Sequence, residues 1–530
     1  MPEPGLSQNL ISRVNLGDLL VRSAARSPNH LAVVDDVFRL SYRDLNRWVN
    51  RTAHGLAALG YCRGDALALM STNRAEFLVT YFACAKLGLV CVPINLFWRQ
   101  SELAYVLDHA HARGIVVEQA SVEQLREALP EAPRLTEIIV IDGSAPSFGE
   151  RRGLRFDDLQ SGAPDDEPEV FVEDRDAISY LYTSGTTSAP KGVVSSHLAV
   201  YLESLGSALE TRFTAADRVS ALLPLFHTAQ LNAIATPAIA VGATIFIQRG
   251  FDADRLIALI ERERLTVTFA LPMMYRAVLD ALDAVPRDVS SLRLAIYAMA
   301  PMPAHELERG MEKLGCEFSL MFGQTELNPL SAYFRPANQL THPGAVGTPS
   351  VNVQIAIMDG EGRLLPQGQS GEIVYRSPQV LSGYLRNPEA TAAAFAGGWF
   401  HSGDSGHLDA DGILWFADRF KDVIKTGGEN VASIEVEKAV YAADPGVAEV
   451  AVIGLPHERW GEAITAVVIT KAGHALKEDD LLVRLRQHLS PYKCPKRIVF
   501  VDSMPKTATG KIQKAKLRVE LADLYRAGKV

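Results

Sequence analysis

The chain has 530 residues, of which 48% are hydrophobic and 22% charged, and its formal net charge is -9. This length and composition exclude a peptide, a disulfide-stabilised mini-protein, a lone binding module and a disordered chain, and they predict several folded domains. The negative charge argues against a protein that coats nucleic acid. The charge is uneven, because residues 477–530 carry a net +7 and the rest of the chain -16. Charge alone leaves two interpretations of this basic tail open, a solvated helical face and a surface that handles phosphate.

The sequence predicts a protein of the reducing cytoplasm without a membrane-spanning segment. Its five cysteines are scattered and include no CxxC pair, so neither a disulfide framework nor a zinc site is expected. The N-terminus has neither the basic nor the apolar region of a secretory signal. Residues 219–248 contain no Asp, Glu, Lys or Arg, but Pro224, Pro237 and Gly242 divide this stretch into a strand, a loop, a helix and a second strand.

Helices alternate with short buried strands in the first part of the chain. The segment Ser41-Tyr42-Arg43-Asp44 predicts the capped start of a helix that reaches Leu59. Strands are expected at residues 66–70, 90–94, 115–117 and 138–141, and further helices at residues 76–87 and 102–109. This alternation predicts a layered α/β unit.

The remaining chain divides into three parts of different character. A second α/β unit is predicted between residues 177 and 323, with strands at 219–225, 243–248, 295–300 and 318–322. Residues 351–375 alternate in polarity around an Asp359-Gly360 turn and predict a small antiparallel β subdomain. Residues 422–530 predict a short α+β module with strands at 423–425, 450–453 and 463–470, a helix opening near Ser433 and another helix at 479–489.

A loop rich in hydroxyls and glycine follows the strand that ends near Tyr182. Backbone N–H groups, several hydroxyls and one ammonium are the donors that a polyphosphate needs, and the loop is expected to connect a strand to a helix. It is not a Walker A loop, because Pro190 stands where that motif needs glycine and Gly192 where it needs Ser or Thr. A Ser/Thr-rich surface turn is the alternative interpretation. The expected phosphate-binding residues are Thr183, Ser184, Gly185, Thr186, Thr187 and Lys191.

Six further segments accompany this loop along the chain. They are PLFH at 224–227, APMP at 300–303, FGQTE at 322–326, SGD at 402–404, DRFKD at 418–422 with GGEN at 427–430, and PKTATGKI at 505–512. In this order the seven segments resemble those of the adenylate-forming enzymes, which include acyl-CoA synthetases, luciferases and the adenylation domains of peptide synthetases. The resemblance covers nearly the whole chain, and the ordered set makes it specific.

The resemblance implies an α/β fold in which a large N-terminal domain, residues 1–420, comprises two α/β subdomains and a small β subdomain. A small mobile α+β domain, residues 421–530, would follow. The implied activity is that of an acyl-CoA ligase: a carboxylic acid and ATP give an acyl-adenylate and pyrophosphate, and CoA then gives the thioester and AMP. ATP, Mg²⁺ and CoA are therefore expected to bind. No nucleic-acid partner is expected, and a homodimer is allowed.

Several motif matches imply roles around the nucleotide. Thr325 and Glu326 match the pair that contacts the α-phosphate and Mg²⁺, with Thr183 as a second metal contact, and these oxygen donors suit a hard cation. Phe322 would stack on adenine, where the family often has tyrosine, although its place at a strand end also fits a core aromatic. The implied ribose-binding pair and the other nucleotide contacts are Asp404, Arg419, Ala300, Pro301 and Gly323.

The C-terminal module is expected to alternate between two poses. Lys511 matches the catalytic lysine, whose ammonium brings the carboxylate and the α-phosphate together against their mutual repulsion. Lys421 matches the hinge about which the module rotates, and Gly427 and Gly428 would leave room for the pantetheine arm of CoA. Without the resemblance, Lys511 would be one lysine of a solvated face and the two glycines a plain turn.

The positions that match the family's acyl pocket carry no carboxylate. A free α-amino acid would leave its ammonium unpaired there, so amino acids are disfavoured. Gly323 stands where the acetate-specific branch has tryptophan, so a longer tunnel stays open. Fatty acids of medium or long chain are favoured, and aryl and arylpropenoic acids are retained. The positions are Thr228, Asn232, Met299, Leu327, Leu330 and His227, the last of which also counts among the implied catalytic residues.

Two alternative functions stay open. The same chemistry could load the phosphopantetheine of a carrier protein in place of free CoA, and transfer to each acceptor would separate the two. A non-catalytic nucleotide-binding protein on the same fold is an alternative of another class. The presence of Lys511, Glu326 and Thr183 argues against it.

Overall fold

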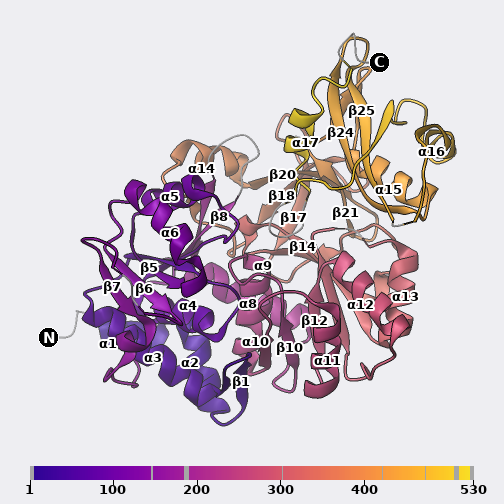
Figure 1. Ribbon diagram of the computed structural model, residues 1–530. Coiled ribbons are helices and arrows are strands. Elements are labelled where there is room, and N and C mark those ends of the chain that lie inside the picture. The colour runs from indigo at the N-terminus through magenta and orange to yellow at the C-terminus, as the bar shows by residue number, and fades with distance from the viewer. Residues whose placement is uncertain are drawn as a thin grey trace. The chain divides into compact units, whose positions relative to one another are not determined.

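The computed structural model describes residues 5–144, 147–183, 190–300, 302–420, 422–471, 473–506 and 512–525, without the side chain of Asn430. Figure 1 traces the chain from indigo at the N-terminus to yellow at the C-terminus. It divides into two compact units, Met1–Ile355 with Tyr375–Phe400, and Ala356–Val374 with His401–Val530. The predicted boundary at Lys421 lies outside the described residues and stays a prediction. Within the described ranges, no helix has the length and apolarity to cross a bilayer.

The first unit contains an eight-stranded sheet with the order β19-β9-β8-β4-β3-β5-β6-β7. Its central strands are parallel and almost wholly apolar, as expected for strands covered on both faces. The predicted helix start at Ser41 is confirmed, because the Ser41 side chain accepts a hydrogen bond from the Asp44 N–H. The strands are β3 (Ala66–Met70), β4 (Val90–Pro93), β5 (Ala112–Glu118), β6 (Glu137–Ile141), β7 (Arg152–Arg155), β8 (Ala177–Thr183), β9 (Lys191–Ser196) and β19 (Gly383–Tyr384). The helices are α1 (Leu6–Ser12), α2 (Gly17–Arg26), α3 (Tyr42–Ala58), α4 (Ala75–Leu87), α5 (Gln100–His109), α6 (Val122–Ala128) and α7 (Phe156–Gln160).

A nine-stranded sheet with the order β16-β15-β14-β13-β12-β10-β11-β1-β2 forms the other half of this unit. Strand β13 runs parallel to β14, whereas β15 returns antiparallel. In Figure 1 helices α11, α12 and α13 lie beside these strands. The strands are β1 (Leu31–Val34), β2 (Arg39–Ser41), β10 (Arg218–Ala221), β11 (Thr244–Ile247), β12 (Val267–Ala270), β13 (Leu294–Ala298), β14 (Glu317–Gly323), β15 (Leu330–Phe334) and β16 (Thr348–Pro349). The helices are α8 (His197–Thr211), α9 (Thr228–Gln230), α10 (Thr236–Val241), α11 (Ala253–Glu263), α12 (Pro272–Ala284) and α13 (Ala304–Leu314). Helix α14 (Pro388–Ala394) instead contacts β19 of the eight-stranded sheet.

The hydroxyl-rich loop connects two strands, and the expectation that it leads into a helix is wrong. Strand β9 pairs antiparallel with β8, and helix α8 begins only after Ser196, whose side chain caps it by accepting from the Ala199 N–H. The apolar residues Val193 and Val194 continue the sheet because β19 pairs with them on the other side. Strands β8 and β9 are therefore the two arms of a hairpin.

The strand predicted at residues 219–225 is shorter, because β10 ends at Ala221. Beyond that point the backbone hydrogen-bonds to the side chain of Asn73, which follows β3. Its amide nitrogen donates to the Leu223 carbonyl at 2.8 Å, and its amide oxygen accepts from the Leu225 N–H at 2.8 Å. A buried asparagine thus replaces a neighbouring strand and turns the chain toward His227.

The second unit is built on two sheets, of which the one in the C-terminal module is mixed because β26 runs parallel to β25. The β-rich character predicted around Asp359 is confirmed by a sheet of order β17-β18-β20-β21. A second sheet, β23-β22-β25-β24 with β26 beside β25, belongs to the C-terminal module. Sequence analysis missed β26 and α17, and it extended α16 too far, since that helix ends at Leu485. The elements are β17 (Gln354–Met358), β18 (Gly371–Arg376), β20 (Phe400–Leu408), β21 (Leu414–Arg419), β22 (Ile424–Thr426), β23 (Glu429–Val431), α15 (Ser433–Ala443), β24 (Val447–His457), β25 (Gly461–Thr470), α16 (Glu478–Leu485), β26 (Arg497–Phe500) and α17 (Lys514–Glu520).

Candidate active site

The β8–β9 hairpin presents the first of the predicted nucleotide-binding residues. Thr183 ends β8 and lies opposite Lys191, which begins β9. The Lys191 side chain is exposed, so its ammonium is available to an anion. Four predicted phosphate contacts, Ser184, Gly185, Thr186 and Thr187, lie outside the described residues.

Thr325 and Glu326 follow β14 on a short 3₁₀ turn, Thr325–Leu327. The chain folds back tightly here, because the Gln324 N–H donates to the Pro329 carbonyl at 3.1 Å. Gly323 makes this possible: a Cβ at this position would lie 1.8 Å from the Pro329 oxygen. Only glycine therefore lets the backbone approach so closely, and the turn presents a hydroxyl and a carboxylate at the end of the strand.

Tyr384 connects the hairpin to this turn. Its hydroxyl donates to the Glu326 carboxylate at 3.1 Å, and the Lys191 ammonium lies 5.0 Å from the centre of its ring. Burial, reinforced by the Glu326 carboxylate, holds the pKa of Tyr384 above its usual range, so the phenol is a neutral donor. Sequence reasoning missed this residue, because its place depends on pairing between β9 and β19, which are far apart in the chain.

A buried polar cluster supports the turn from behind. The Gln379 amide nitrogen donates to the carbonyls of Leu327 at 3.1 Å and Leu330 at 2.7 Å, and to the Glu203 carboxylate at 2.8 Å. The Ser207 hydroxyl donates to the other Glu203 oxygen at 2.7 Å. Burial raises the pKa of Glu203 to about 8. Helix α8 and Gln379 therefore fix both ends of the segment that follows Glu326.

The predicted adenine-binding residues lie where two parallel strands end. Ala298 of β13 pairs with Met321 of β14, so Ala300, just beyond β13, and Phe322, near the end of β14, lie at neighbouring strand ends. Ala300 is exposed and Phe322 half-buried, which leaves the Phe322 ring in part accessible. The carboxyl edge of parallel strands is the usual ligand site of an α/β sheet. Pro301 lies outside the described residues.

His227 lies at the start of α9, in a largely apolar setting. Burial lowers its pKa to about 4, so the imidazole is neutral at physiological pH. Its Nε2 is buried without a hydrogen-bond partner among the described residues. An unpaired ring nitrogen is costly in a packed interior, so it is suited to meet a polar atom of a ligand.

The other predicted acyl-pocket positions are mostly packed. Asn232 has no exposed surface, and its amide donates to the Thr228 hydroxyl at 3.0 Å and accepts from the Tyr81 hydroxyl at 3.1 Å. Leu327 is 0% and Leu330 1% exposed, whereas Met299 is 42% exposed. Asn232, Leu327 and Leu330 are therefore packed in this structure, whereas Met299 is accessible.

The second unit brings the predicted ribose pair together. Asp404 of β20 lies opposite Arg419 of β21, and the guanidinium and carboxylate are 3.3 Å apart. Gly427 and Gly428 form the exposed β22–β23 turn, both with positive φ. The Gly427 N–H donates to the Trp460 carbonyl at 2.8 Å, and a Cβ on Gly427 would meet the Trp460 ring at 3.2 Å.

Two predicted functional lysines cannot be placed. Lys421 and Lys511 lie outside the described residues. Residues on both sides of 507–511 are described, and Lys506 forms an isolated antiparallel bridge with Ile512. The roles assigned to both lysines stay predictions.

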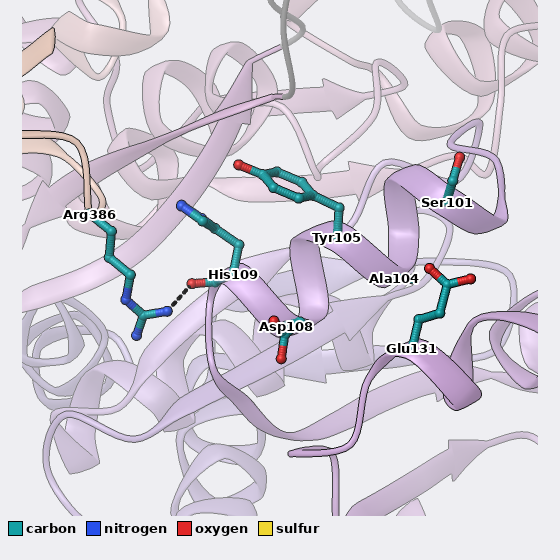
Figure 2. Close-up of a pocket in the computed structure, with 7 residues that line it drawn as sticks. All are labelled: Ser101, Ala104, Tyr105, Asp108, His109, Glu131 and Arg386. Carbon is teal, nitrogen blue, oxygen red and sulfur yellow. Dashed lines mark hydrogen bonds between the residues drawn. The ribbon is translucent and has the colours of Figure 1, made fainter.

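A separate cavity of about 380 Å³ lies beside α5 (Figure 2). Tyr105 and His109 project from this helix, and the Arg386 guanidinium donates to the His109 carbonyl. On the sheet side, His109 Nδ1 and the Tyr182 hydroxyl are 2.8 Å apart. None of the predicted site residues lines this cavity.

Thr183 and Glu326 fit a magnesium ion chemically. A hydroxyl and a carboxylate are oxygen donors of the type that Mg²⁺ takes together with phosphate and water. Lys191, which lies opposite Thr183 in the hairpin, contacts the Tyr384 ring, and the Tyr384 hydroxyl donates to Glu326. These contacts bring the segments that carry Thr183 and Glu326 to one place.

The chain matches the model described as AMP-binding enzyme over residues 20–385, and that of the AMP-binding enzyme C-terminal domain over residues 435–511. It is 37% identical over 508 residues to a feruloyl-CoA synthase of an Amycolatopsis species, covering 95% of this chain and 98% of that protein. It is 34% identical over 516 residues to a long-chain-fatty-acid–CoA ligase of Mycobacterium tuberculosis, covering 95% and 98%. The crystal structure of ATP-bound MatB from Rhodopseudomonas palustris superposes with a TM-score of 0.87 at 30% identity, covering 97% of this chain and 100% of that chain.

Proposed function

The chain belongs to the AMP-binding enzyme family, and on that premise we propose that it is an acid–thiol ligase that forms acyl-CoA with release of AMP and pyrophosphate. In the first step a carboxylate oxygen of the acid attacks the α-phosphorus of ATP, and pyrophosphate leaves. In the second step the CoA thiolate attacks the acyl carbon, and AMP leaves. The reaction therefore uses ATP, Mg²⁺ and CoA.

One observation chiefly supports the proposal: Lys191 and Glu326 both contact the side chain of Tyr384. A triphosphate needs a cation for its terminal phosphates, and a magnesium-bound phosphate needs an acidic ligand nearby. Lys191 would hold the β- and γ-phosphates, and Thr325 would donate to the α-phosphate. Two segments that are distant in the chain thus supply complementary groups for one nucleotide.

Magnesium, held by Glu326 and Thr183, would neutralise charge on the phosphates when bound. The chain's own residues supply the remaining interactions. The Asp404 carboxylate would accept hydrogen bonds from the ribose hydroxyls while Arg419 keeps it oriented, and Phe322 would stack on adenine. Lys511 would hold the attacking carboxylate against the α-phosphate. Lys421 would then act as the hinge that exchanges Lys511 for the Gly427-Gly428 turn.

The structure favours an aryl or arylpropenoic acid over a long alkyl chain. Asn232 and Leu327 have no exposed surface, so a long chain would have to displace packed residues at these positions. A neutral His227 with an unpaired Nε2 suits a hydroxyl or ring substituent of the acid. Fatty acids of medium or long chain are the second candidate, supported by the fatty-acid ligase relative.

Coenzyme A is the proposed thiol acceptor, and a carrier-protein phosphopantetheine is the alternative. A cytoplasmic location is proposed because all five cysteines are free. A homodimer is a further proposal, to be tested by light scattering on the purified protein.

The decisive experiment is an acid panel assayed for pyrophosphate release with and without CoA. The panel should run from acetate to octadecanoate and include benzoate, indoleacetate, coumarate and ferulate. We expect release with the aryl acids and stoichiometric AMP formation only when CoA is added. Release that requires a holo carrier protein would support the alternative acceptor, and no release with any acid would overturn the ligase assignment.

A further inference from the structure

The segment that carries Tyr384 is held rigidly along its length. The Leu381 N–H donates to the Glu326 carbonyl at 2.7 Å, which ties the start of the segment to the turn. The Leu385 N–H donates to the Gly192 carbonyl at 2.8 Å, which ties it to β9. Beyond it, the Arg386 side chain reaches the His109 carbonyl at the cavity in Figure 2. The backbone at Tyr384 is therefore anchored to three different elements.

The Tyr384 side chain contacts two charged groups and so restrains both of them. The hydroxyl donates to the Glu326 carboxylate, while the ring face attracts the Lys191 ammonium. The ring is half-buried and lies between the hairpin and the turn. An aspartate or lysine here would attract only one of the two groups, whereas a phenol has a donor at its end and a negative face on its ring.

We propose that Tyr384 is a positioning residue for adenylation, which fixes the Glu326 carboxylate relative to Lys191 so that a magnesium-bound triphosphate meets both groups in place. The proposal rests on the proposed function of this site. Tyr384 acts through its two neighbours, because its hydroxyl is used by Glu326 and its ring by Lys191. Its effect should therefore be confined to the half-reaction that uses ATP and metal, and should spare transfer from a preformed adenylate to CoA.

The test replaces Tyr384 with phenylalanine, which removes the hydroxyl and keeps the ring beneath Lys191. A hydrogen bond to a charged group stabilises by enough to shift an equilibrium about ten-fold, so Tyr384→Phe should raise the Mg²⁺ concentration for half-maximal pyrophosphate release about ten-fold. Binding of Mn²⁺ with a non-hydrolysable ATP analogue, followed by electron paramagnetic resonance, should weaken by the same factor. Thioester formation from synthetic acyl-adenylate and CoA should be unchanged.

The matched control is Tyr42→Phe, which removes the hydroxyl of a fully buried tyrosine away from the site. The Tyr42 hydroxyl donates to the Ala243 carbonyl at 2.6 Å, so its loss should lower thermal stability and leave the Mg²⁺ dependence unchanged. Unchanged Mg²⁺ and Mn²⁺ affinity in Tyr384→Phe would overturn the proposal, as would an equal loss in both half-reactions. Failure of the wild-type enzyme to adenylate any acid would instead overturn the proposed function.

Discussion

Replacement of Gly323 by alanine tests whether the close approach behind Glu326 is essential. The added Cβ would lie 1.8 Å from the Pro329 oxygen and 2.8 Å from its carbonyl carbon, whereas real Cβ atoms essentially never come closer than 3.0 Å. These are backbone atoms, so no side-chain rotation relieves the contact, and the two segments must separate by about the 1.2 Å difference. The hydrogen bond from the Gln324 N–H to the Pro329 carbonyl would be broken by this movement.

The expected cost combines overpacking with one lost hydrogen bond, about 2–4 kcal/mol in the free energy of unfolding. Because the displaced turn carries Thr325 and Glu326, a shift of about 1 Å should also lower kcat/KM for ATP about 100-fold. Urea unfolding and pyrophosphate release measure the two effects. Gly250→Ala is the matched control, since a Cβ at Gly250 would meet nothing within 4 Å. Wild-type stability and kinetics in Gly323→Ala would refute the reasoning.

Three further predictions concern other parts of the molecule. Lys511→Ala should reduce adenylation about 100-fold or more and spare thioester formation from preformed acyl-adenylate, and equal loss in both steps would contradict the two-pose model. Lys421→Pro should cripple one half-reaction selectively by fixing φ, measured as accumulated acyl-adenylate, and a folded variant with both steps unchanged would exclude a pivot there. The pKa of Glu203 is raised from 4.5 to about 8, so its protonation stabilises the fold fully below pH 4.5, and this stabilisation is lost as pH rises through 8. Glu203→Gln should therefore flatten the decline of melting temperature between about pH 5 and pH 9, and a parallel decline would show that Glu203 is not the titrating group.

Local patterns predicted the local parts of the fold. The cap at Ser41 and the strand at residues 66–70 were confirmed because neighbouring residues determine both features. The predicted fold class is confirmed by the superposition on MatB. The β9 strand was missed, although it pairs with the neighbouring β8 over Lys191–Ser196. The strand on its other side, β19, comes nearly two hundred residues later. Contacts between such distant segments leave no periodicity in either sequence.

The residues of the candidate site likewise fall into those that motifs indicated and those that only the fold places there. Motif matches indicated Thr183, Lys191 and Glu326, and the structure brings their segments together. Asp404 and Arg419 lie opposite each other, as a pair acting on one ribose requires, although that role stays a prediction. Tyr384 and the buried Glu203 carry no recognisable motif, because what each does follows from groups that other strands and helices place around it.

The buried contact between Glu203 and Gln379 also restricts how this sequence could have diversified. A lineage that replaces Glu203 by an apolar residue leaves the buried Ser207 hydroxyl without its acceptor. Loss of Gln379 leaves a Glu203 oxygen and the Leu327 and Leu330 carbonyls without their donor. Either single replacement passes through a destabilised ancestor, and an exchange of both residues has to supply new partners for these groups. Substitutions at the two positions should therefore be correlated among related sequences, even though 175 intervening residues separate them.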